Sequence, residues 1–524
     1  MSNRRVDAVV VGSGPNGLAA AITLARAGLA VEVYEGAESA GGGCRTEELT
    51  LAGFRHDVCA AVHPLAAASP FFARLGLNAR GVEFRSSPVA FAHPLDGGRA
   101  AAVFSPVLSP VFSPETSQRG LTPTTQAAAA SQAAAASRAA AATRATADSL
   151  GRDAGAYRRL FAPLARDLSK VLPSLLAPFR TFPNHPLALA RLALPGLLPV
   201  NGLAQCLRTE EARGLLAGAA AHSVLPLTSP LTGAFGLLFV ALGHAVGWPV
   251  VEGGSGRLAG ALLEELQALG GQVLTHRTVR SLEELPRARA VLLDISPHQL
   301  AAWAEGRASP AYTRALRNFR YGPGVCKVDW ALTGPVPWQA QACREAVTVH
   351  VGGTFEEVAA SEAEVAAGRH PDRPFCLVAQ PGVVDGSRAP AGHSTLWAYC
   401  HVPAGSTVDM ADRVEAQIER FAPGFRDLVV GRAVRTAAAL AAGNPNYVGG
   451  DISGGASTLR QMLFRPTLGW SPYRTALPGV YLCSSSTPPG AGVHGMCGYW
   501  AARAALCDLG VEPPGSSRQT GPGT

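Results

Sequence analysis

Apolar and glycine-rich stretches alternate over the first 35 residues in the order expected of a strand, a helix and a second strand. Residues 6–11 are mostly apolar, residues 12–17 read Gly-Ser-Gly-Pro-Asn-Gly, and an alanine- and leucine-rich stretch then runs to Gly28. Residues 30–34 are again strand-like and are followed by Glu35. This pattern predicts a β–α–β unit whose first connection is a glycine loop.

The glycine loop has the spacing G-x-G-x-x-G between a strand and a helix, which is typical of a dinucleotide site. Gly12 permits the tight turn, Gly14 lets the backbone approach a pyrophosphate, and Gly17 lets the helix pack closely on the strand. The free N–H groups at the helix N-terminus favour phosphates. Glu35 follows Gly17 by eighteen residues and is placed to accept hydrogen bonds from a ribose, so NADP with its 2′-phosphate is disfavoured.

Patterns that continue this unit return in two later parts of the chain. Residues 256–269 carry leucines at helical spacing, at Leu258, Leu262, Leu263, Leu266 and Leu269. Strands are predicted at 272–274, at 290–294 and just after Gly479, and a last helix opens near Gly495 and runs through Leu506. We therefore expect an α/β fold in which a discontinuous Rossmann-like domain (residues 1–95, 240–300 and 470–513) carries an inserted α+β substrate domain of mixed sheet and helices (residues 148–239 and 301–469).

Residues 103–147 have a different, repetitive pattern. Three Ser-Pro repeats with a period of four are followed by three alanine-rich repeats with a period of six. Ser-Pro repeats favour extended backbone. The alanine tract could form a helix, but it has no apolar stripe that could pack. We expect a weakly ordered low-complexity insert without a catalytic part, and a disordered polar tail at residues 514–524.

Composition removes several classes of function. The net charge is +7, but the arginines are scattered and no basic patch is interleaved with aromatic residues, so a nucleic-acid partner is not expected. The ten cysteines form no C-x-x-C pair and have no metal-like spacing with histidine, which predicts reduced thiols and no metal site. The first strand begins without room for a leader, which predicts a cytoplasmic protein.

The longest uncharged run, residues 222–251, is interrupted by three prolines and several glycines. A buried helix and loop lining a cavity is the favoured interpretation. Shallow, peripheral contact with a membrane is the alternative.

Three blocks together carry a resemblance to a known family. They are the amino-terminal unit, the glycine- and arginine-containing segment 40–57, and the small-residue loop and helix of residues 478–502. The chain resembles the phytoene dehydrogenase-related family of FAD-dependent oxidoreductases, most closely the branch named after pyridine nucleotide-disulphide oxidoreductase domain-containing protein 2. Further matching motifs are residues 247–254, 321–329, 393–403 and 444–451.

The resemblance implies FAD bound non-covalently by the Rossmann-like domain. The residues implied to hold it are Gly12, Ser13, Gly14, Pro15, Asn16, Gly17, Glu35, Gly42, Gly43 and Arg45, main-chain groups near Val279, and Ser485, Gly492 and Val493 towards the flavin end. Ser484-Ser485-Ser486 departs from the Gly-Asp or Gly-Ala of related enzymes, and hydroxyls would replace a carboxylate on the ribityl chain. The resemblance also implies oxidation of an apolar small molecule by hydride transfer to flavin N5, with oxygen or a quinone reoxidising the flavin.

Few residues qualify for acid–base chemistry. His494 precedes the last helix and is the one catalytic candidate, although a structural role is the alternative. Lys327 is expected to face solvent, with an approach to the flavin through a water as the alternative; His401, Tyr399 and Trp397 share one strand face and are candidates to line the pocket. An NAD-linked dehydrogenase and a flavin-binding regulator or scaffold without turnover remain open, and so does the oligomeric state.

Overall fold

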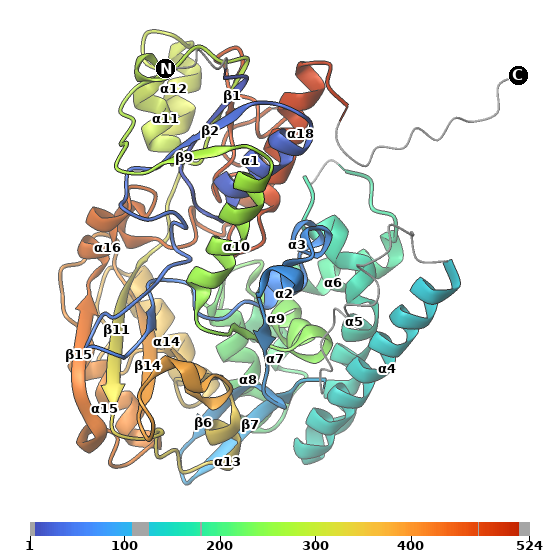
Figure 1. The fold of residues 1–524 in the computed structure, drawn as a ribbon. Helices are drawn as coiled ribbons and strands as arrows, with labels where there is room; N and C mark the ends of the chain where they lie inside the picture. The colour runs from blue at the N-terminus through green and yellow to red at the C-terminus, as the bar shows by residue number, and fades with distance from the viewer. Residues whose placement is uncertain (1–5, 107–124, 179–180, 470, 513–524) are drawn as a thin grey trace, which may run out of the picture.

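The computed structural model describes residues 6–106, 125–178, 181–469 and 471–512, with side chains in the second range from residue 133 onwards. Two sheets form the framework (Figure 1). A parallel sheet lies at the top of the view, an antiparallel sheet at the lower left, and a group of helices at the right. Two further two-stranded sheets join β3 to β4 and β5 to β8.

The parallel sheet has five strands in the order β16-β10-β1-β2-β9. Their bounds are Val480–Leu482, Ala290–Leu293, Ala8–Val11, Val31–Tyr34 and Gln272–Leu274. Ala8 and Val10 join one buried cluster and Val9 and Val11 another, so this sheet is covered on both faces. The helices on one face are α1 (Pro15–Arg26), α10 (Ser255–Ala268) and α18 (Met496–Asp508); on the other they are α11 (Pro297–Trp303) and α12 (Pro310–Arg317).

The second sheet has seven strands in the order β15-β11-β14-β13-β12-β6-β7, and only the β12–β6 pair is parallel. The bounds are Val429–Arg435, Gly324–Leu332, Ser394–Val402, Cys376–Ala379, Thr348–Val351, Val89–Leu95 and Arg99–Phe104. One face packs on α13 (Gln341–Glu345) and α15 (Ala411–Phe421) in an apolar cluster that includes Val328, Trp330, Ala398 and Phe425. The opposite face carries aromatic, histidine and charged side chains.

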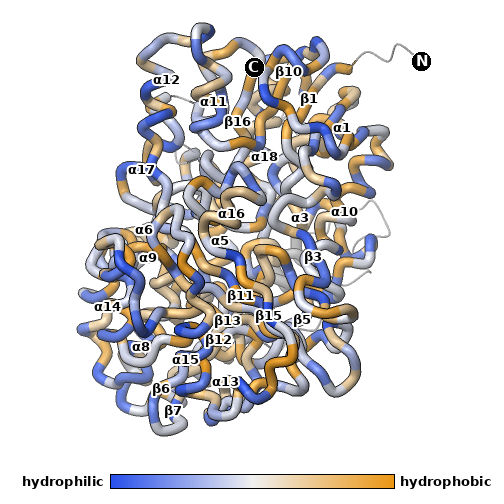
Figure 2. The backbone as a smooth tube through the Cα atoms, turned by 90° about the vertical axis from the view of Figure 1, so that its left-hand side faces the viewer, coloured by the Kyte–Doolittle hydropathy of each residue, from blue (hydrophilic) through white to orange (hydrophobic). Residues whose placement is uncertain are grey.

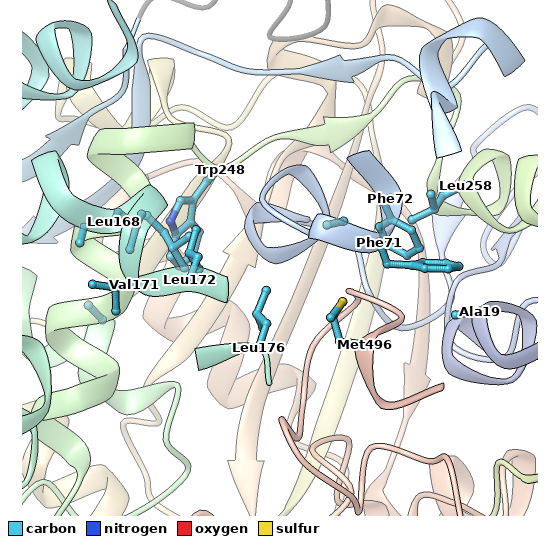
Figure 3. Close-up of a cluster of buried hydrophobic side chains, with 14 of the residues drawn as sticks. Ala19, Phe71, Phe72, Leu168, Val171, Leu172, Leu176, Trp248, Leu258 and Met496 are labelled. Atoms are coloured by element: carbon cyan, nitrogen blue, oxygen red, sulfur yellow. The ribbon is translucent and has the colours of Figure 1, made fainter. Parts of the chain in front are cut away.

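Helices cover the β6–β7 end of this second face. They are α4 (Thr125–Ser149), α5 (Ala154–Leu175), α6 (Pro186–Gly196), α7 (Val200–Ala204), α8 (Glu210–Ala221), α9 (Thr232–Val246) and α14 (Phe355–Ala366). One buried apolar cluster runs from these helices to the parallel sheet. Figure 3 shows its two ends, with Leu172 of α5 beside Trp248 and with Phe71 and Phe72 beside Ala19.

Shorter elements connect these layers. They are β3 (Thr46–Glu47), β4 (His56–Asp57), β5 (Phe84–Arg85), β8 (Val250–Val251), α2 (Pro64–Ala67), α3 (Pro70–Leu75), α16 (Ala437–Gly443) and α17 (Leu459–Phe464). The hydropathy of the chain follows the layers, because the backbone tube is orange through β1 and β10 and blue along parts of α12 and α14 (Figure 2).

Most elements predicted from the sequence are confirmed. The glycine loop joins β1 to α1, the leucine-rich stretch forms α10, the strand at 272–274 is β9, and the last helix begins at Met496. The long uncharged run contains α9, which is buried. No helix of the described residues is both long enough and apolar enough to cross a membrane.

The expectation of a weakly ordered insert over residues 103–147 is wrong for the two parts of it that the structure describes, residues 103–106 and 125–147. Residues 103 and 104 complete β7, and the alanine tract belongs to the 25-residue helix α4. Ala139, Ala142 and Ala147 are buried although the helix has no stripe of large apolar residues. Small side chains let α4 lie close to α5 and α9, and Thr146 Oγ1 accepts a hydrogen bond of 2.9 Å from the N–H of Phe104. Residues 107–124 and the predicted tail, 514–524, lie outside the described residues.

The division into a cofactor domain and a substrate domain stays a prediction, but four elements do not follow its boundaries. Strand β6, within residues 1–95, belongs to the seven-stranded sheet. Helix α9 lies with α5 and α8 although it extends past residue 240. Residues 301–317 include the last three residues of α11 and all of α12, and the apolar side chains of these two helices pack on the parallel sheet.

The packing of α18 on α1 makes a sharp prediction about Gly498. A Cβ at this position would overlap the carbonyl oxygen of Asn16 and lie 2.9 Å from the nitrogen of Ala20. We expect Gly498→Ala to lower the free energy of unfolding by about 3 kcal/mol, because two helix backbones must separate. Chemical denaturation with urea measures this change.

Gly260, inside α10, is the matched control because a Cβ there meets nothing within 4 Å. Gly260→Ala should leave stability unchanged or raise it by up to about 1 kcal/mol through helix propensity. Equal effects of the two substitutions would contradict the close helix–helix contact.

Candidate functional site

The loop between β1 and α1 depends on glycine at defined positions. Gly12 has φ = +96°, a conformation that side chains disfavour, and a Cβ on Gly17 would overlap the carbonyl oxygen of Gly12. Gly14 is the N-cap of α1, and as a glycine it has no side chain that could cap the helix. The first turn of α1, which includes Pro15 and Asn16, therefore begins against the backbone of the loop.

A second glycine loop touches the first. Gly41 and Gly42 have φ of +121° and +56°, and a Cβ on Gly42 would lie 2.9 Å from Gly14 Cα. The N–H of Gly41 donates to the carbonyl oxygen of Ser13 at 3.1 Å. Two glycine backbones without side chains thus meet in front of a helix N-terminus, which is the arrangement that accepts a diphosphate.

Glu35 lies at the carboxyl end of β2, above the first loop. Its Oε2 accepts hydrogen bonds from the N–H and the hydroxyl of Ser13 at 2.9 and 2.5 Å, and its Oε1 accepts from the N–H of Ala37 at 2.8 Å. The Glu35 carbonyl oxygen accepts from the N–H of Arg277 at 2.8 Å, which brings the segment leading to Val279 alongside. Glu35 is therefore fixed at the edge of the loop, where a ribose would lie.

Arg45 and Asn16 present buried polar atoms without hydrogen bonds. Arg45 Nε makes no hydrogen bond to the described residues, and Glu47 Oε1 lies 3.6 Å from it. Asn16 Oδ1 is likewise unpaired. A cofactor that carries phosphates and hydroxyls fits both groups, because the guanidinium donates and the amide oxygen accepts.

A buried carboxyl that the sequence patterns did not single out lies beneath the first loop. Asp294 follows β10, and its Oδ2 accepts a hydrogen bond of 3.0 Å from the N–H of Gly17. Burial, together with the charge of Glu35, raises the pKa of Asp294 to about 7 against the opposing effect of the Gly17 N–H. Its place could have been found from its position after a strand adjacent to β1, at the carboxyl edge of a parallel sheet.

The carboxy-terminal block closes the site from the side of α18. Ser484 Oγ is buried without a hydrogen-bond partner among the described residues, and the hydroxyl of Ser486 donates to the carbonyl oxygen of Gly454 at 2.8 Å. Gly454 has no room for a Cβ because the side chain of Ser485 lies against it. Gly492, with φ = +118°, and Val493 lead into α18.

His494 has a structural contact at the start of α18. Its Nδ1 accepts a hydrogen bond of 3.0 Å from the N–H of Met496, and its carbonyl oxygen accepts one of 2.6 Å from the hydroxyl of Ser69. Burial lowers the pKa of His494 to about 4, although the carbonyls of Gly490 and Ala491 oppose the shift. A neutral ring that satisfies a helix N-terminus explains this residue, and its catalytic role stays a prediction.

Lys327 is buried, so the expectation of a solvent-facing lysine is wrong. Its side chain is 2% exposed and forms an ion pair with Asp329, two residues further along β11. Burial lowers the pKa of Lys327 and raises that of Asp329, and the attraction between the two opposes both shifts. Lys327 Nζ also lies 5.6 Å from the ring centroid of Trp397, and His56 Nδ1 lies 3.6 Å from Asp329 Oδ1.

An apolar and aromatic surface lies between this pair and the second glycine loop. Trp397 and Tyr399 share one face of β14, as predicted, with ring centroids 5.3 Å apart. They form one buried cluster with residues from four other segments: Ala61, Val325, Leu377, Ala379 and Leu440. Val62, Tyr447 and Ile452 pack against this cluster. Tyr447 connects the cluster to the loop, because a Cβ on Gly43 would overlap the Tyr447 hydroxyl. The sequence reasoning did not assign a role to Tyr447.

Comparisons with known proteins agree on one class. The NAD(P)-binding Rossmann-like domain family matches residues 10–75. Pyridine nucleotide-disulfide oxidoreductase domain-containing protein 2 of Rattus norvegicus is 27% identical over 574 residues, which cover 96% of this chain and 94% of the rat protein. A 4,4′-diapolycopen-4-al dehydrogenase of Metabacillus indicus is 33% identical over 135 residues, which cover 24% and 26% of the two chains. These similarities support an enzyme of the FAD-dependent oxidoreductase type.

A solved structure supports the fold of this FAD-dependent oxidoreductase. An oxidoreductase from Methanosarcina mazei superposes with a TM-score of 0.59 at 14% identity, covering 96% of this chain and 100% of that one. The expected fold class is thereby confirmed. The expected enzyme class is confirmed by the similarity to the rat and Metabacillus indicus proteins. The individual cofactor residues stay predictions, although the structure brings Gly12 to Gly17, Glu35, Gly42 and Gly43 together around the start of α1.

Among the residues with described side chains, no group of three or more histidine, cysteine, aspartate or glutamate residues is arranged to hold a metal ion. All ten cysteines are free thiols.

The buried Asp294 predicts a dependence of stability on pH. Its pKa is raised from 3.8 to about 7 on folding, so the folded state binds this proton more tightly and its contribution to stability is lost as the pH rises from about 4 to about 7. The loss amounts to at most about 4 kcal/mol. Asp294→Asn keeps an acceptor for the Gly17 N–H and removes the charge.

We expect Asp294→Asn to be more stable than the unsubstituted protein at pH 8 and to differ little from it at pH 4.5. Urea unfolding at the two pH values measures the difference. A variant that loses equal stability at both pH values would show that the charge of Asp294 is not the source of the pH dependence.

Proposed function

We propose that this oxidoreductase binds FAD non-covalently between its two glycine loops and oxidises an apolar small molecule by hydride transfer to flavin N5. The observation that carries the proposal is the contact between Tyr447 and Gly43. It joins the diphosphate-binding arrangement to a buried surface of Trp397, Tyr399 and Val325. A cofactor lying along the loops would reach these apolar side chains of the sheet with one of its ends. An apolar substrate could pack against the same side chains.

Each glycine loop has its own part in holding the cofactor. The N–H groups at the start of α1 and the backbone of Gly42 are suited to the diphosphate, and Glu35 to the ribose of the adenosine half. Arg45 supplies a donor with a free Nε beside the second loop. Ser485, Gly492 and Val493 lie on the side of α18, towards the flavin end.

The bound flavin would supply the hydride acceptor, and the protein supplies orientation and exclusion of water. Lys327 and Asp329 supply a buried pair of opposite charges on an otherwise apolar face. Lys327 can donate a hydrogen bond to a water or a polar atom of the bound molecules, and the charge of Asp329 opposes the lowering of the Lys327 pKa by burial.

A named relative supports the apolar character of the substrate. The matching segment of the Metabacillus indicus protein belongs to a dehydrogenase named for 4,4′-diapolycopen-4-al. Oxygen or a quinone is the proposed acceptor of the electrons, and stopped-flow mixing of reduced protein with each identifies it. The exposed side chains of Phe182, Leu187 and Leu194, at 84%, 78% and 68%, are available for peripheral contact with a membrane.

The absorption spectrum of the purified protein tests cofactor binding. Bands near ~375 and ~450 nm that leave the protein on denaturation would identify non-covalent flavin. Gly42→Ala should lose these bands, because its Cβ would lie 2.9 Å from Gly14 Cα at a φ of +56°. Gly260→Ala, which changes an open position, should retain them.

Other spectra would support the alternatives. A colourless protein that refuses added FAD but binds NAD would be an NAD-linked dehydrogenase. Bound flavin that no apolar alcohol, aldehyde or hydrocarbon reduces would favour a regulator or scaffold.

The Lys327–Asp329 pair makes a further prediction. Lys327→Met should lower the free energy of unfolding by about 3–5 kcal/mol, because it leaves a buried carboxylate unpaired. The double variant Lys327→Met/Asp329→Asn removes both charges and should recover most of that loss. Thermal or urea unfolding of both variants decides, and a double variant no more stable than the single one would argue against a coupled pair.

A further inference from the structure

A second buried pair lies on the same sheet face, beyond Tyr399. His401 follows Tyr399 by two positions on β14, with ring centroids 5.6 Å apart, and its side chain is 1% exposed. Glu362 of α14 places both carboxylate oxygens 2.9 Å from His401 Nδ1, and its own side chain is 2% exposed. The pair therefore joins α14 to the apolar surface proposed to meet the substrate.

The hydrogen bond to Glu362 determines which nitrogen of the His401 ring carries the proton. An ionised carboxylate only accepts hydrogen bonds, so Nδ1 carries the proton and donates it. With that proton on Nδ1, Nε2 is the ring atom that can accept a proton, and it is buried without a hydrogen-bond partner among the described residues. The carboxylate also stabilises the imidazolium that forms when Nε2 takes a proton.

The groups packed around His401 offer no competing base. Tyr399 flanks it on β14, and the ring of Phe375 lies 6.0 Å away on the chain leading into β13. His222, at the end of α8, is near enough to interact electrostatically, but burial lowers its pKa to about 3, and a protonated His401 adds to that shift. His222 is thus neutral, and its Nε2 already shares a hydrogen bond of 2.9 Å with His350 Nε2.

We propose that His401, oriented by Glu362, is the catalytic base that takes the hydroxyl proton of an apolar alcohol bound on this sheet face. The inference rests on the proposed flavin-dependent oxidation and narrows its substrate class. An imidazole is basic enough to take the proton of a hydroxyl while the hydroxyl becomes a carbonyl. It is too weak a base to deprotonate an unactivated C–H bond of a hydrocarbon.

The step balances in atoms and electrons. The C–H bond of the carbinol carbon would break with its electron pair, and a bound flavin would supply the two-electron acceptor for this hydride. The O–H bond breaks as its proton moves to His401 Nε2, and the freed electron pair forms the C=O bond. The alcohol is thereby oxidised to a carbonyl compound, and the imidazolium stays paired with Glu362.

The tautomer of His401 tests the pair without reference to turnover. In the full-length protein labelled with ¹⁵N in its histidine rings, the His401 signals are those lost in His401→Asn. We expect nitrogen shifts of a ring protonated at Nδ1 and bare at Nε2 near neutral pH. A ring protonated at Nε2 would overturn the proposal, whether or not the protein binds FAD.

Anaerobic bleaching of the flavin band tests the chemistry. Farnesol is the alcohol probe and farnesene, which lacks the hydroxyl, is its matched hydrocarbon. We expect farnesol alone to bleach the flavin, and His401→Ala to slow bleaching by about 100-fold or more. Free imidazole, which fits the space left by the ring, should restore at least about a tenth of the lost rate.

His393→Asn is the matched control, because His393 is exposed just before β14 and its ring hydrogen-bonds the carbonyl oxygen of Ala391, outside the proposed site. It should bleach at the unsubstituted rate. Glu362→Gln keeps an acceptor for Nδ1 but not the charge, so it should fold, retain flavin and slow bleaching by about 10- to 100-fold.

The outcomes separate the two proposals. If the protein binds no flavin, the proposed function is wrong. The ¹⁵N measurement then still shows which nitrogen of His401 carries the proton. Bound flavin that farnesene bleaches and farnesol does not, or that neither probe bleaches, overturns the alcohol assignment. Unchanged bleaching in His401→Ala, or a loss that imidazole does not rescue, overturns the role of His401.

Discussion

The close approach of backbones at the start of α1 is the constraint on which the rest of the structure depends. Gly17 lies against the carbonyl of Gly12, Gly42 against Gly14, and Gly498 of α18 against the carbonyl of Asn16. No side chain can separate these segments. The helix N-terminus is therefore held between two loops and a second helix, with its N–H groups already oriented before any ligand binds.

The seven-stranded sheet separates stability from chemistry by its two faces. Val328, Trp330 and Phe425 belong to the face covered by α13 and α15, which is apolar. Its other face carries Lys327 with Asp329 and, beyond Trp397 and Tyr399, His401 with Glu362. Buried ion pairs add little to stability compared with apolar packing, so two of them on one face indicate a site rather than a core.

Local patterns explain why the cofactor loops could be predicted from the sequence. The alternation of residues 6–35 and the leucine spacing of α10 depend on neighbours along the chain, and the structure confirms both. Asp294 and Tyr447 were missed because their partners, Gly17 and Gly43, lie hundreds of positions away. The order of helix α4 was misjudged for another reason. Alanine side chains are small, so a helix that packs through them lies close to its neighbours without a stripe of large apolar residues that the sequence could reveal.

Lys327 shows that the periodicity of a strand predicts the face on which a side chain lies but not whether that face is buried. Alternation along β11 places it correctly on the face opposite Val328, but alternation cannot say whether that face meets water or a second layer. Tertiary packing decides this, because Trp397 of the neighbouring strand and the His56 segment cover it. A lysine enclosed in this way must have a counter-charge within reach, and Asp329 on the same strand face is in reach. A Lys-x-Asp sequence in a strand that is apolar on its other face is thus a signal of a buried pair, and here it marks the part of the sheet nearest the glycine loops.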